Sequence, residues 1–402
     1  MPVKLIALHH RLAGFGGHRY NEALGLIEES RRRGWELDLL VSVHAPEAVV
    51  ARLAPFARPV LDDPTFDFNR TFEQRVDEFV RQLRAHAEPA LTADSRVLVT
   101  VATQCEACAL ARWARQLPRD GMPSFFLLFL SDRWNRAGAR PDEPAEIAAA
   151  GRELARLDAA TRPRFALFAS TAELAAELAH RLSAPVSAPP AHLNYRGLAE
   201  IAGARRDRPV PGRPAVGLIG GSRPEKGSHL VPAVVAACRD RVPVRFIVHA
   251  FDEGLTAAAL DAIRSLRADP SVRVIEGQLE RDEYEGVLDE IDILLCPYER
   301  LNYRHRNSGI FAEAVAAGLP AVVPSGTWMA DQIAAGRAAG VIYDGDGPEA
   351  VAAGLQRCAA VLPALTAAAA GLAAPWRESE SLGAALDAME RVYAAQSGAA
   401  AT

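Results

Sequence analysis

Short apolar runs alternate with stretches of helical spacing along most of the chain. Residues 3–8 form one such run, as expected of a strand that is buried in a parallel sheet. A glycine-rich turn follows at residues 14–17, and apolar side chains then recur at helical spacing over residues 23–27. The same order of strand, turn and helix returns repeatedly, which predicts parallel sheets covered by helices on both faces.

The predicted strands fall into two series. The first series comprises residues 3–8, 37–43, 96–103, 125–130 and 165–169, and the second comprises residues 215–219, 244–250, 272–276, 291–296, 321–323 and 341–343. Residues 185–214 are rich in Pro, Arg, Ala and Gly with weak periodicity, which predicts a linker region. The fold class is therefore α/β, with two Rossmann-like domains whose parallel sheets face each other across a cleft. Ligands of such folds bind at the carboxyl ends of the strands.

We place the domains at residues 1–190 and 191–375, with residues 376–402 as a C-terminal helix that returns to the first domain. A chain of 402 residues, of which 50% are hydrophobic and 24% charged, has the composition of a globular protein with large cores. Its net charge of −5 argues against nucleic acid as a partner. The 5 cysteines indicate no disulfide framework. The sequence predicts no signal peptide or transmembrane segment, a cytoplasmic location, and at most peripheral membrane contact.

The turn after the strand at residues 215–219 has the composition of a phosphate-binding loop. It reads Gly-Gly-Ser-Arg-Pro-Glu-Lys-Gly over residues 220–227, and lysine occurs elsewhere only at Lys4. Its glycines, among them Gly221, allow a ligand close to the backbone, while Arg223 and Lys226 place two cations at the carboxyl end of a strand. Fixed donors of this kind suit a diphosphate. The pattern lacks the ending of a Walker A motif, and a solvated charged turn remains the alternative.

A second candidate is the apolar segment at residues 307–320, which predicts a short helix capped by Ser308 and ended by Gly318. The free amides of Ser308 and Gly309 are suited to phosphate oxygens. Glu313 is too deep in the helix to belong to a capping box, and its carboxylate is suited to the two ribose hydroxyls of a nucleotide. The alternative is a surface glutamate.

Taken in order, the motifs of the second half resemble those of the retaining nucleotide-sugar glycosyltransferases of family four, which have the GT-B fold. The resemblance covers residues 216–393 and rests on ordered matches. These are the 220–227 loop, Glu276 and Gly277 at a strand end, the strand before Pro297, the Glu313 helix, and Trp376-Arg377 before the last helix. The resemblance implies a nucleoside-diphosphate-sugar site in the second domain, an acceptor site in the first, retention of configuration, and no cofactor or obligatory metal.

The resemblance also implies roles for individual residues. Arg223, Lys226, Asp132 and His305 are the catalytic candidates. Asp132 follows the strand at 125–130, where a carboxylate is suited to orient a hydroxyl or act as a base, although a helix cap is an equal alternative. The donor-binding set is Gly16, Gly17, Gly221, Ser222, Arg223, Lys226, Glu276, Gly277, Asn307, Ser308, Gly309 and Glu313.

Two positions depart from the family pattern. The family often has a histidine at about the place of Ser131, which lies beside Asp132. The family has a glutamate eight positions before Glu313, and His305 stands there, within a segment at 298–306 that carries extra residues. The missing glutamate leaves the donor sugar open.

The predicted function is transfer of a sugar from a nucleoside-diphosphate sugar to a hydroxyl of a glycan, a lipid-linked acceptor or a small molecule, as a hexosyltransferase-like enzyme of glycan biosynthesis. The alternatives are a non-catalytic nucleotide-binding module, a nucleotide-sugar epimerase or phosphorylase, and an oxidoreductase. The oxidoreductase is disfavoured because residues 14–19 do not complete a dinucleotide-binding motif.

Overall fold

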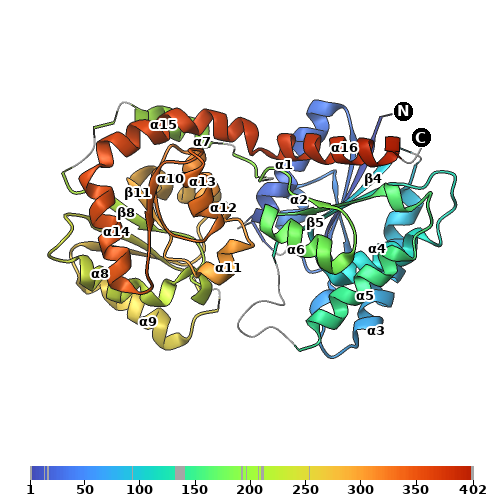
Figure 1. Cartoon of the computed structure of the whole chain (residues 1–402), viewed down its shortest axis with the longest axis horizontal. Coiled ribbons are helices and arrows are strands. Elements are labelled where there is room, and N and C mark those ends of the chain that lie inside the picture. The colour runs from blue at the N-terminus through green and yellow to red at the C-terminus, as the bar shows by residue number, and fades with distance from the viewer. Residues whose placement is uncertain are drawn as a thin grey trace. The chain divides into compact units, whose positions relative to one another are not determined.

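The computed structural model describes residues 2–12, 14–15, 18–92, 94–131, 141–191, 193–195, 197–206, 208–209, 212–252 and 254–399. Its contacts divide the chain into two compact units (Figure 1). Unit 1 comprises residues 1–194 and 380–402, and unit 2 comprises residues 195–379. The last helix, α16 (Leu382–Ala399), therefore belongs to unit 1, where it packs against α1 and β6. Arg33 and Arg96 of this unit bind its acidic side chains Asp387 (2.8 Å) and Glu390 (3.0 Å).

Unit 1 contains a parallel sheet of seven strands in the order β3-β2-β1-β4-β5-β6-β7. The strands are β1 (Lys4–His9), β2 (Glu36–Ser42), β3 (Ala57–Leu61), β4 (Ser95–Ala102), β5 (Ser124–Phe129), β6 (Phe165–Ala169) and β7 (Val186–Ser187). The other helices are α1 (His18–Arg33), α2 (Glu47–Arg52), α3 (Phe72–Gln82), α4 (Gln104–Ala114), α5 (Glu143–Ala155) and α6 (Ala172–Leu182).

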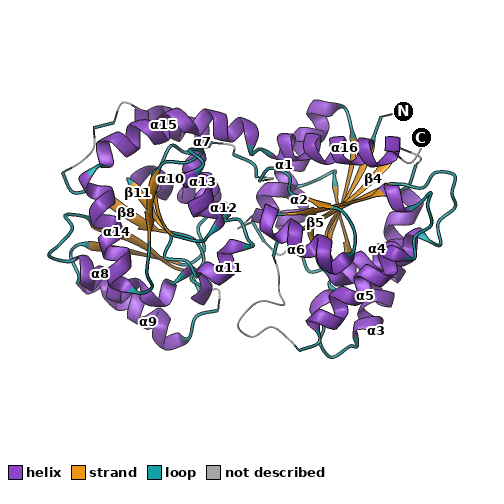
Figure 2. Cartoon of the chain, viewed as in Figure 1, coloured by secondary structure: helices purple, strands orange, loops and turns teal. Residues whose placement is uncertain are grey.

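Alternate residues of β1, β2, β4, β5 and β6 are buried in two different clusters. Ile6 and Leu8 of β1 pack with α3, α4, α5 and α6, whereas Leu5 and Ala7 pack with α1, α2 and α16. Both faces of the sheet are thus covered (Figure 2), which explains why its strands are apolar throughout rather than alternating.

Unit 2 repeats the architecture with six parallel strands in the order β10-β9-β8-β11-β12-β13. They are β8 (Ala215–Leu218), β9 (Arg245–Ala250), β10 (Val272–Glu276), β11 (Ile293–Leu295), β12 (Ala321–Pro324) and β13 (Gly340–Tyr343). Its helices are α7 (Leu198–Arg206), α8 (Val231–Cys238), α9 (Ala257–Ser265), α10 (Arg281–Glu290), α11 (Arg300–Arg304), α12 (Gly309–Ala316), α13 (Trp328–Ala334), α14 (Pro348–Ala360) and α15 (Leu362–Ser379). The predicted α/β class with two parallel sheets is confirmed.

The predicted linker at residues 185–214 contains the division between the two units, at residues 194 and 195, but the segment is wrong as an irregular linker because it contains β7 and helix α7. Leu198, Ile201 and Ala202 of α7 are buried. Arg205, buried as well, donates to the backbone oxygens of Leu288 (2.6 Å) and Asp289 (2.7 Å) at the end of α10. These tertiary contacts hold a helix whose sequence alone has weak periodicity.

Among the residues described, no single helix is long and apolar enough to cross a bilayer. The bent pair α14 and α15 meets the length and composition test only when the two helices are taken together.

The core of unit 1 contains a glutamate that makes stability depend on pH. Glu22 of α1 is buried and accepts a hydrogen bond from Thr100 Oγ1 at 3.0 Å. Burial raises the pKa of Glu22 to about 8, so the folded state holds this proton at neutral pH while the unfolded state releases it. The stability that protonation provides is complete below the unfolded pKa near 4.5 and is lost as the pH rises through 8.

We therefore expect unfolding free energy to fall by about 2–3 kcal/mol between pH 6 and pH 8 through this group alone. Glu22→Gln removes the titration, so urea unfolding of that variant should show a correspondingly flatter pH dependence. Glu36→Gln, at an exposed glutamate of the same unit, is the control and should behave as the parent. A parent-like slope in Glu22→Gln would contradict the assignment.

Candidate functional site

The strand order of unit 2 reverses between β8 and β11, which lie next to each other. In open parallel sheets, ligands bind outside the carboxyl ends of the two strands at such a switch point. The loop after β8 is the predicted phosphate loop, and residues 296–298 follow β11. A pocket of unit 2 lies here, lined by the loop residues Gly220, Gly221, Ser222 and Lys226, and by Tyr298.

Ser222 ties the phosphate loop to the neighbouring strand. Its side chain is buried and its Oγ donates to the backbone oxygen of His249 at 3.0 Å, while its amide donates to the backbone oxygen of Phe251 at 2.6 Å. Ser222 therefore fixes the loop against β9 while it also lines the pocket.

Lys226 folds back over the start of the loop. Its Nζ lies 3.3 Å from the point that a Cβ on Gly220 would occupy, and Ile310 Cδ1 of α12 lies only 2.1 Å from that point. Gly220 has a φ of 93°, so a side chain there would be both strained and blocked. The bare backbone at Gly220 thus leaves room for the ammonium group beside the pocket.

Arg223 stands at the start of a short 3-10 turn, Pro224–Lys226, and its amide donates to Ser228 Oγ at 3.1 Å. The side chains of Arg223 and Lys226 are half-buried. Lys226 lines the pocket at the switch point, and Arg223 begins the turn that contains Lys226. This arrangement supplies the positive charge that a diphosphate needs.

The loops after β8 and β11 are bonded to each other. The amide of Glu299 donates to the backbone oxygen of Glu225 at 2.9 Å, and Arg306 lies 3.7 Å from the Glu225 carboxylate. Gly227 packs so closely that a Cβ would lie 2.0 Å from the backbone oxygen of Pro297. The two sides of the switch point therefore form one connected structure.

Helix α12 begins at the same edge of the sheet, and its predicted caps are confirmed. Ser308 is buried and its Oγ accepts from the amide of Phe311 at 3.2 Å, while Gly318 follows the last turn with a φ of 74°. Gly309 is the first helical residue, and the half-buried Asn307 precedes the cap.

Glu313 is buried at 5% exposure, so it is not a surface glutamate. One carboxylate oxygen accepts from Arg281 Nη1 at 3.0 Å and the other accepts from the hydroxyl of Tyr284 at 2.8 Å. Burial, and after it the Glu313 charge, raise the pKa of Tyr284 well above its usual value, so this hydroxyl keeps its proton and donates. We call this arrangement of Arg281 and Tyr284 around Glu313 the clamp. Each carboxylate oxygen accepts up to two hydrogen bonds, so the clamp orients Glu313 and leaves each oxygen able to accept one more.

Arg281 and Tyr284 escaped the sequence reasoning. They lie three residues apart on α10, which places them on one helix face. The available signal was an arginine and a tyrosine at helical spacing among the acidic residues in the first turns of the helix just before β11.

Glu276 and Gly277 end β10 in different roles. The Glu276 side chain is exposed and pairs with Arg267 and with Arg264, the latter at 3.1 Å. The backbone oxygen of Gly277 lies 2.6 Å from His249 Nε2. Backbone at Gly277 is thus tied to β9, while the Glu276 carboxylate is engaged by arginines that follow β9.

His305 ends the short helix α11, which is formed by the extra residues at 298–306, and its side chain is half-buried. The rings of Tyr298 and Tyr303 pack at 4.4 Å beneath this helix. Through Glu225, the helix is held against the phosphate loop. Three predicted residues, Gly16, Gly17 and Asp132, lie outside the described residues.

No model of a known protein family and no curated protein sequence matches the chain. Solved structures do match over nearly its whole length. HepE of Anabaena in complex with UDP-glucose is 13% identical with a TM-score of 0.62, covering 98% of this chain and 99% of that one.

Two further matches are synthases. The sucrose-phosphate synthase of Thermosynechococcus elongatus is 15% identical with a TM-score of 0.64, covering 99% of both chains. The UDP-forming α,α-trehalose-phosphate synthase of Burkholderia xenovorans is 12% identical with a TM-score of 0.65, covering 100% of both chains. At this level of identity the likeness concerns the fold, and the chain has the GT-B fold.

Proposed function

We propose that this protein is a glycosyltransferase that moves a sugar from a nucleoside-diphosphate sugar to a hydroxyl acceptor. The observation that carries the proposal is the glycine loop at residues 220–227, which places Arg223 and Lys226 at the switch point of unit 2. The similarity to HepE, whose structure contains UDP-glucose, makes uridine-diphosphate sugars the first donors to test.

In the proposed reaction, Arg223 and Lys226 neutralise the diphosphate as it leaves the sugar. Charge that develops on the leaving group is stabilised by cations that are already in place, which lowers the barrier to breaking the glycosidic bond. Amides at Ser308 and Gly309 add donors for phosphate oxygens. Asp132 is proposed to orient the acceptor hydroxyl or act as a base, and His305 remains a further catalytic candidate. The reaction is proposed to retain the configuration of the sugar.

The ribose is assigned to Glu313. Its two oxygens each hold one hydrogen bond in the clamp, and the remaining lone pairs are suited to the two neighbouring ribose hydroxyls. A clamp that fixes the carboxylate before binding reduces the ordering cost of association.

The direct test incubates the protein with UDP-, GDP- and ADP-glucose, with and without sugar acceptors, and measures release of the nucleotide and formation of a glycoside. We expect release that is stimulated by an acceptor. Nucleotide binding without turnover would indicate a non-catalytic module, and isomerised donor sugar would indicate an epimerase. A protein that neither binds nor cleaves any of these donors would contradict the proposal.

Tyr284→Phe tests the clamp. Removing the hydroxyl leaves one oxygen of Glu313 without its orienting hydrogen bond, so we expect affinity for the bound nucleotide to fall about three- to tenfold, or about 0.7–1.4 kcal/mol, because ordering is lost rather than a direct contact with the ligand. Isothermal titration calorimetry would measure this change. Tyr393→Phe, in unit 1, is the matched control and should bind as the parent does. Equal affinities in parent and Tyr284→Phe would exclude a role for the clamp.

A further inference from the structure

Exposed apolar side chains gather at the carboxyl edge of the unit 1 sheet. Of the described residues, five large apolar side chains are exposed. Phe66 (36%) and Phe68 (53%) follow β3, and Val43 (46%) follows β2, which is its neighbour in the sheet. The other two, Leu301 and Val361, lie in unit 2. Three of the five therefore belong to one edge, the edge at which parallel sheets bind ligands.

The two phenylalanines are held in a fixed geometry. Their ring centroids are 6.1 Å apart at an interplanar angle of 76°. The Arg11 guanidinium lies 4.5 Å from the Phe66 centroid and the Arg75 guanidinium 5.4 Å from the Phe68 centroid. Cation–π contacts of this kind restrain exposed rings, so the two phenylalanines form a surface of fixed geometry.

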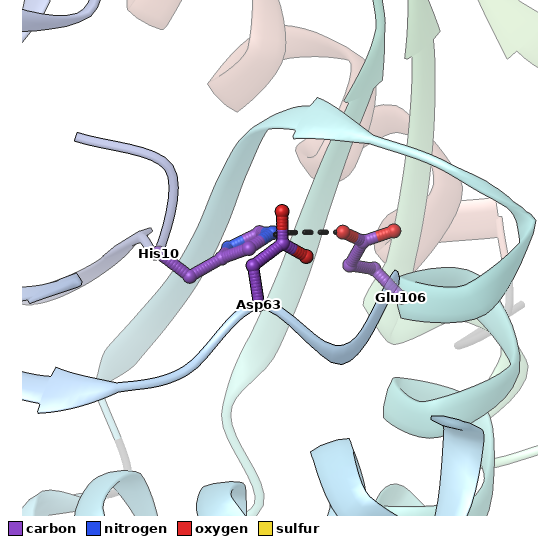
Figure 3. Close-up of side chains that lie close together, drawn as sticks. All are labelled: His10, Asp63 and Glu106. Carbon is purple, nitrogen blue, oxygen red and sulfur yellow. Dashed lines mark hydrogen bonds and ion pairs between the residues drawn. The ribbon is translucent and has the colours of Figure 1, made fainter. Parts of the chain in front are cut away.

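A network of polar side chains anchors the segment at residues 62–70, and Figure 3 shows three of its members, His10, Asp63 and Glu106. Asp63 accepts from Arg11 Nε at 2.9 Å, and Arg11 also donates to Glu106 at 2.7 Å. Glu106 is fully buried and accepts from His10 Nε2 (2.9 Å) and Thr65 Oγ1 (3.0 Å). These residues follow β1, β3 and β4, so the network anchors the segment at residues 62–70 to the point where the strand order reverses, between β1 and β4.

The network does not have the free coordination that a metal site needs. The donor atoms of His10, Asp63 and Glu106 lie within 4.8 Å of one another, which is compatible with a three-ligand cation site. However, Arg11 already bonds both carboxylates. Although burial alone would raise it, Arg11 and His10 hold the pKa of Glu106 well below its usual range. The Arg11 guanidinium therefore supplies the positive charge that a metal ion would bring to these carboxylates. His10, Asp63 and Glu106 act as a scaffold for the surface that Phe66 and Phe68 form.

Polar side chains alternate with the exposed rings. The segment reads Asp62-Asp63-Pro64-Thr65-Phe66-Asp67-Phe68-Asn69-Arg70, and the side chains of Asp67 and Arg70 are 32% and 44% exposed. Asn69 is exposed as well. Carboxylate, amide and guanidinium groups bond neighbouring hydroxyls, while an aromatic face takes apolar C–H surface. Asp67 and Arg70 pair with each other at 2.9 Å and keep further donors and acceptors for a ligand. A sugar ring offers both polar and apolar surface, whereas an alkyl chain offers only apolar surface.

We propose that residues 62–70 bind a carbohydrate acceptor, with a sugar ring stacked on Phe66 or Phe68 and its hydroxyls bonded by Asp67, Asn69 and Arg70. This inference rests on the proposed function, since it names the substrate class of the acceptor. It places the acceptor sugar on a surface that belongs entirely to unit 1. The aromatic pair selects for carbohydrate, and Arg11 and Glu106 act as positioning residues beneath it.

The experiment combines transfer assays with direct binding. Acceptors are mono- and disaccharides, a long-chain alcohol and a phenol, and saturation-transfer NMR measures contact of each disaccharide with the protein in the presence of UDP. The variants are Phe66→Ala, Phe68→Ala and the conservative Phe68→Trp. Val361→Ala removes an equally exposed apolar side chain from unit 2 and is the matched control.

We expect saccharides to be the acceptors used. Each alanine variant should raise the acceptor KM about tenfold and weaken the NMR signal without changing UDP affinity. Phe68→Trp and Val361→Ala should keep parent values. The inference is overturned if the alanine variants keep the parent KM and NMR signal, or if only the alcohol or phenol is used. If no donor is turned over, the proposed function fails instead, and the NMR measurement still decides whether this surface binds sugars.

Discussion

Replacing Arg223 and Lys226 together by alanine is expected to lower affinity for a nucleoside diphosphate by at least about 100-fold. Each cation supplies charge-assisted hydrogen bonds of about 1.5–3 kcal/mol to the phosphates, and a 100-fold loss corresponds to about 2.8 kcal/mol. Calorimetry with UDP, or with whichever diphosphate binds the parent, would measure the loss. The effect should decrease at high salt, because both side chains are only half-buried.

A nucleoside without phosphates tests whether the lost affinity concerns the diphosphate alone. Uridine should bind the double variant and the parent equally weakly, since Arg223 and Lys226 are proposed to contact only the diphosphate. Arg273→Ala removes an exposed arginine of β10, which pairs with Glu290, and should leave UDP affinity unchanged. If the double variant bound UDP as tightly as the parent, the assignment of the 220–227 loop would be wrong.

The sequence missed β3, which contains Arg58, and the two-residue strand β7. It predicted the other five strands of unit 1 and all six of unit 2, because buried parallel strands are apolar throughout and have turns between them. Their carboxyl ends then located the phosphate loop and the Glu313 helix. The resemblance to family four predicted the GT-B fold, which the solved structures support at low identity.

Contacts between segments distant in sequence escaped prediction. Nothing in the order of residues places Arg281 and Tyr284 against Glu313, because α10 and α12 are separated by β11. The same holds for helix α7, whose arginine caps another helix. The scaffold beneath Phe66 joins residues that follow three different strands, so periodicity along the chain could not have found it. Local patterns thus predicted the strands and helices, whereas packing between them produced the Glu313 clamp and the network beneath Phe66.

Gly227→Ala is the second change with a large expected effect. The residue has a φ of 67°, which costs an alanine about 1–2 kcal/mol. In addition, the new Cβ would lie 2.0 Å from the backbone oxygen of Pro297. A carbonyl of the neighbouring loop cannot move as a side-chain tip does, so the phosphate loop must shift away from the residues after β11. We expect a loss of at least about 3 kcal/mol in unfolding free energy, together with weakened nucleotide binding.

Gly336→Ala separates the two contributions to this loss. Gly336 has nearly the same φ, 69°, but nothing lies within 4 Å of the position of its Cβ. Its variant should therefore show only the cost of the backbone conformation and should bind nucleotide as the parent does. Urea unfolding and UDP calorimetry on both variants would measure the difference. Equal losses of stability would mean that the contact with Pro297 contributes nothing, whereas a larger loss at Gly227, accompanied by weaker binding, would show that the two loops of the switch point hold the cations in place.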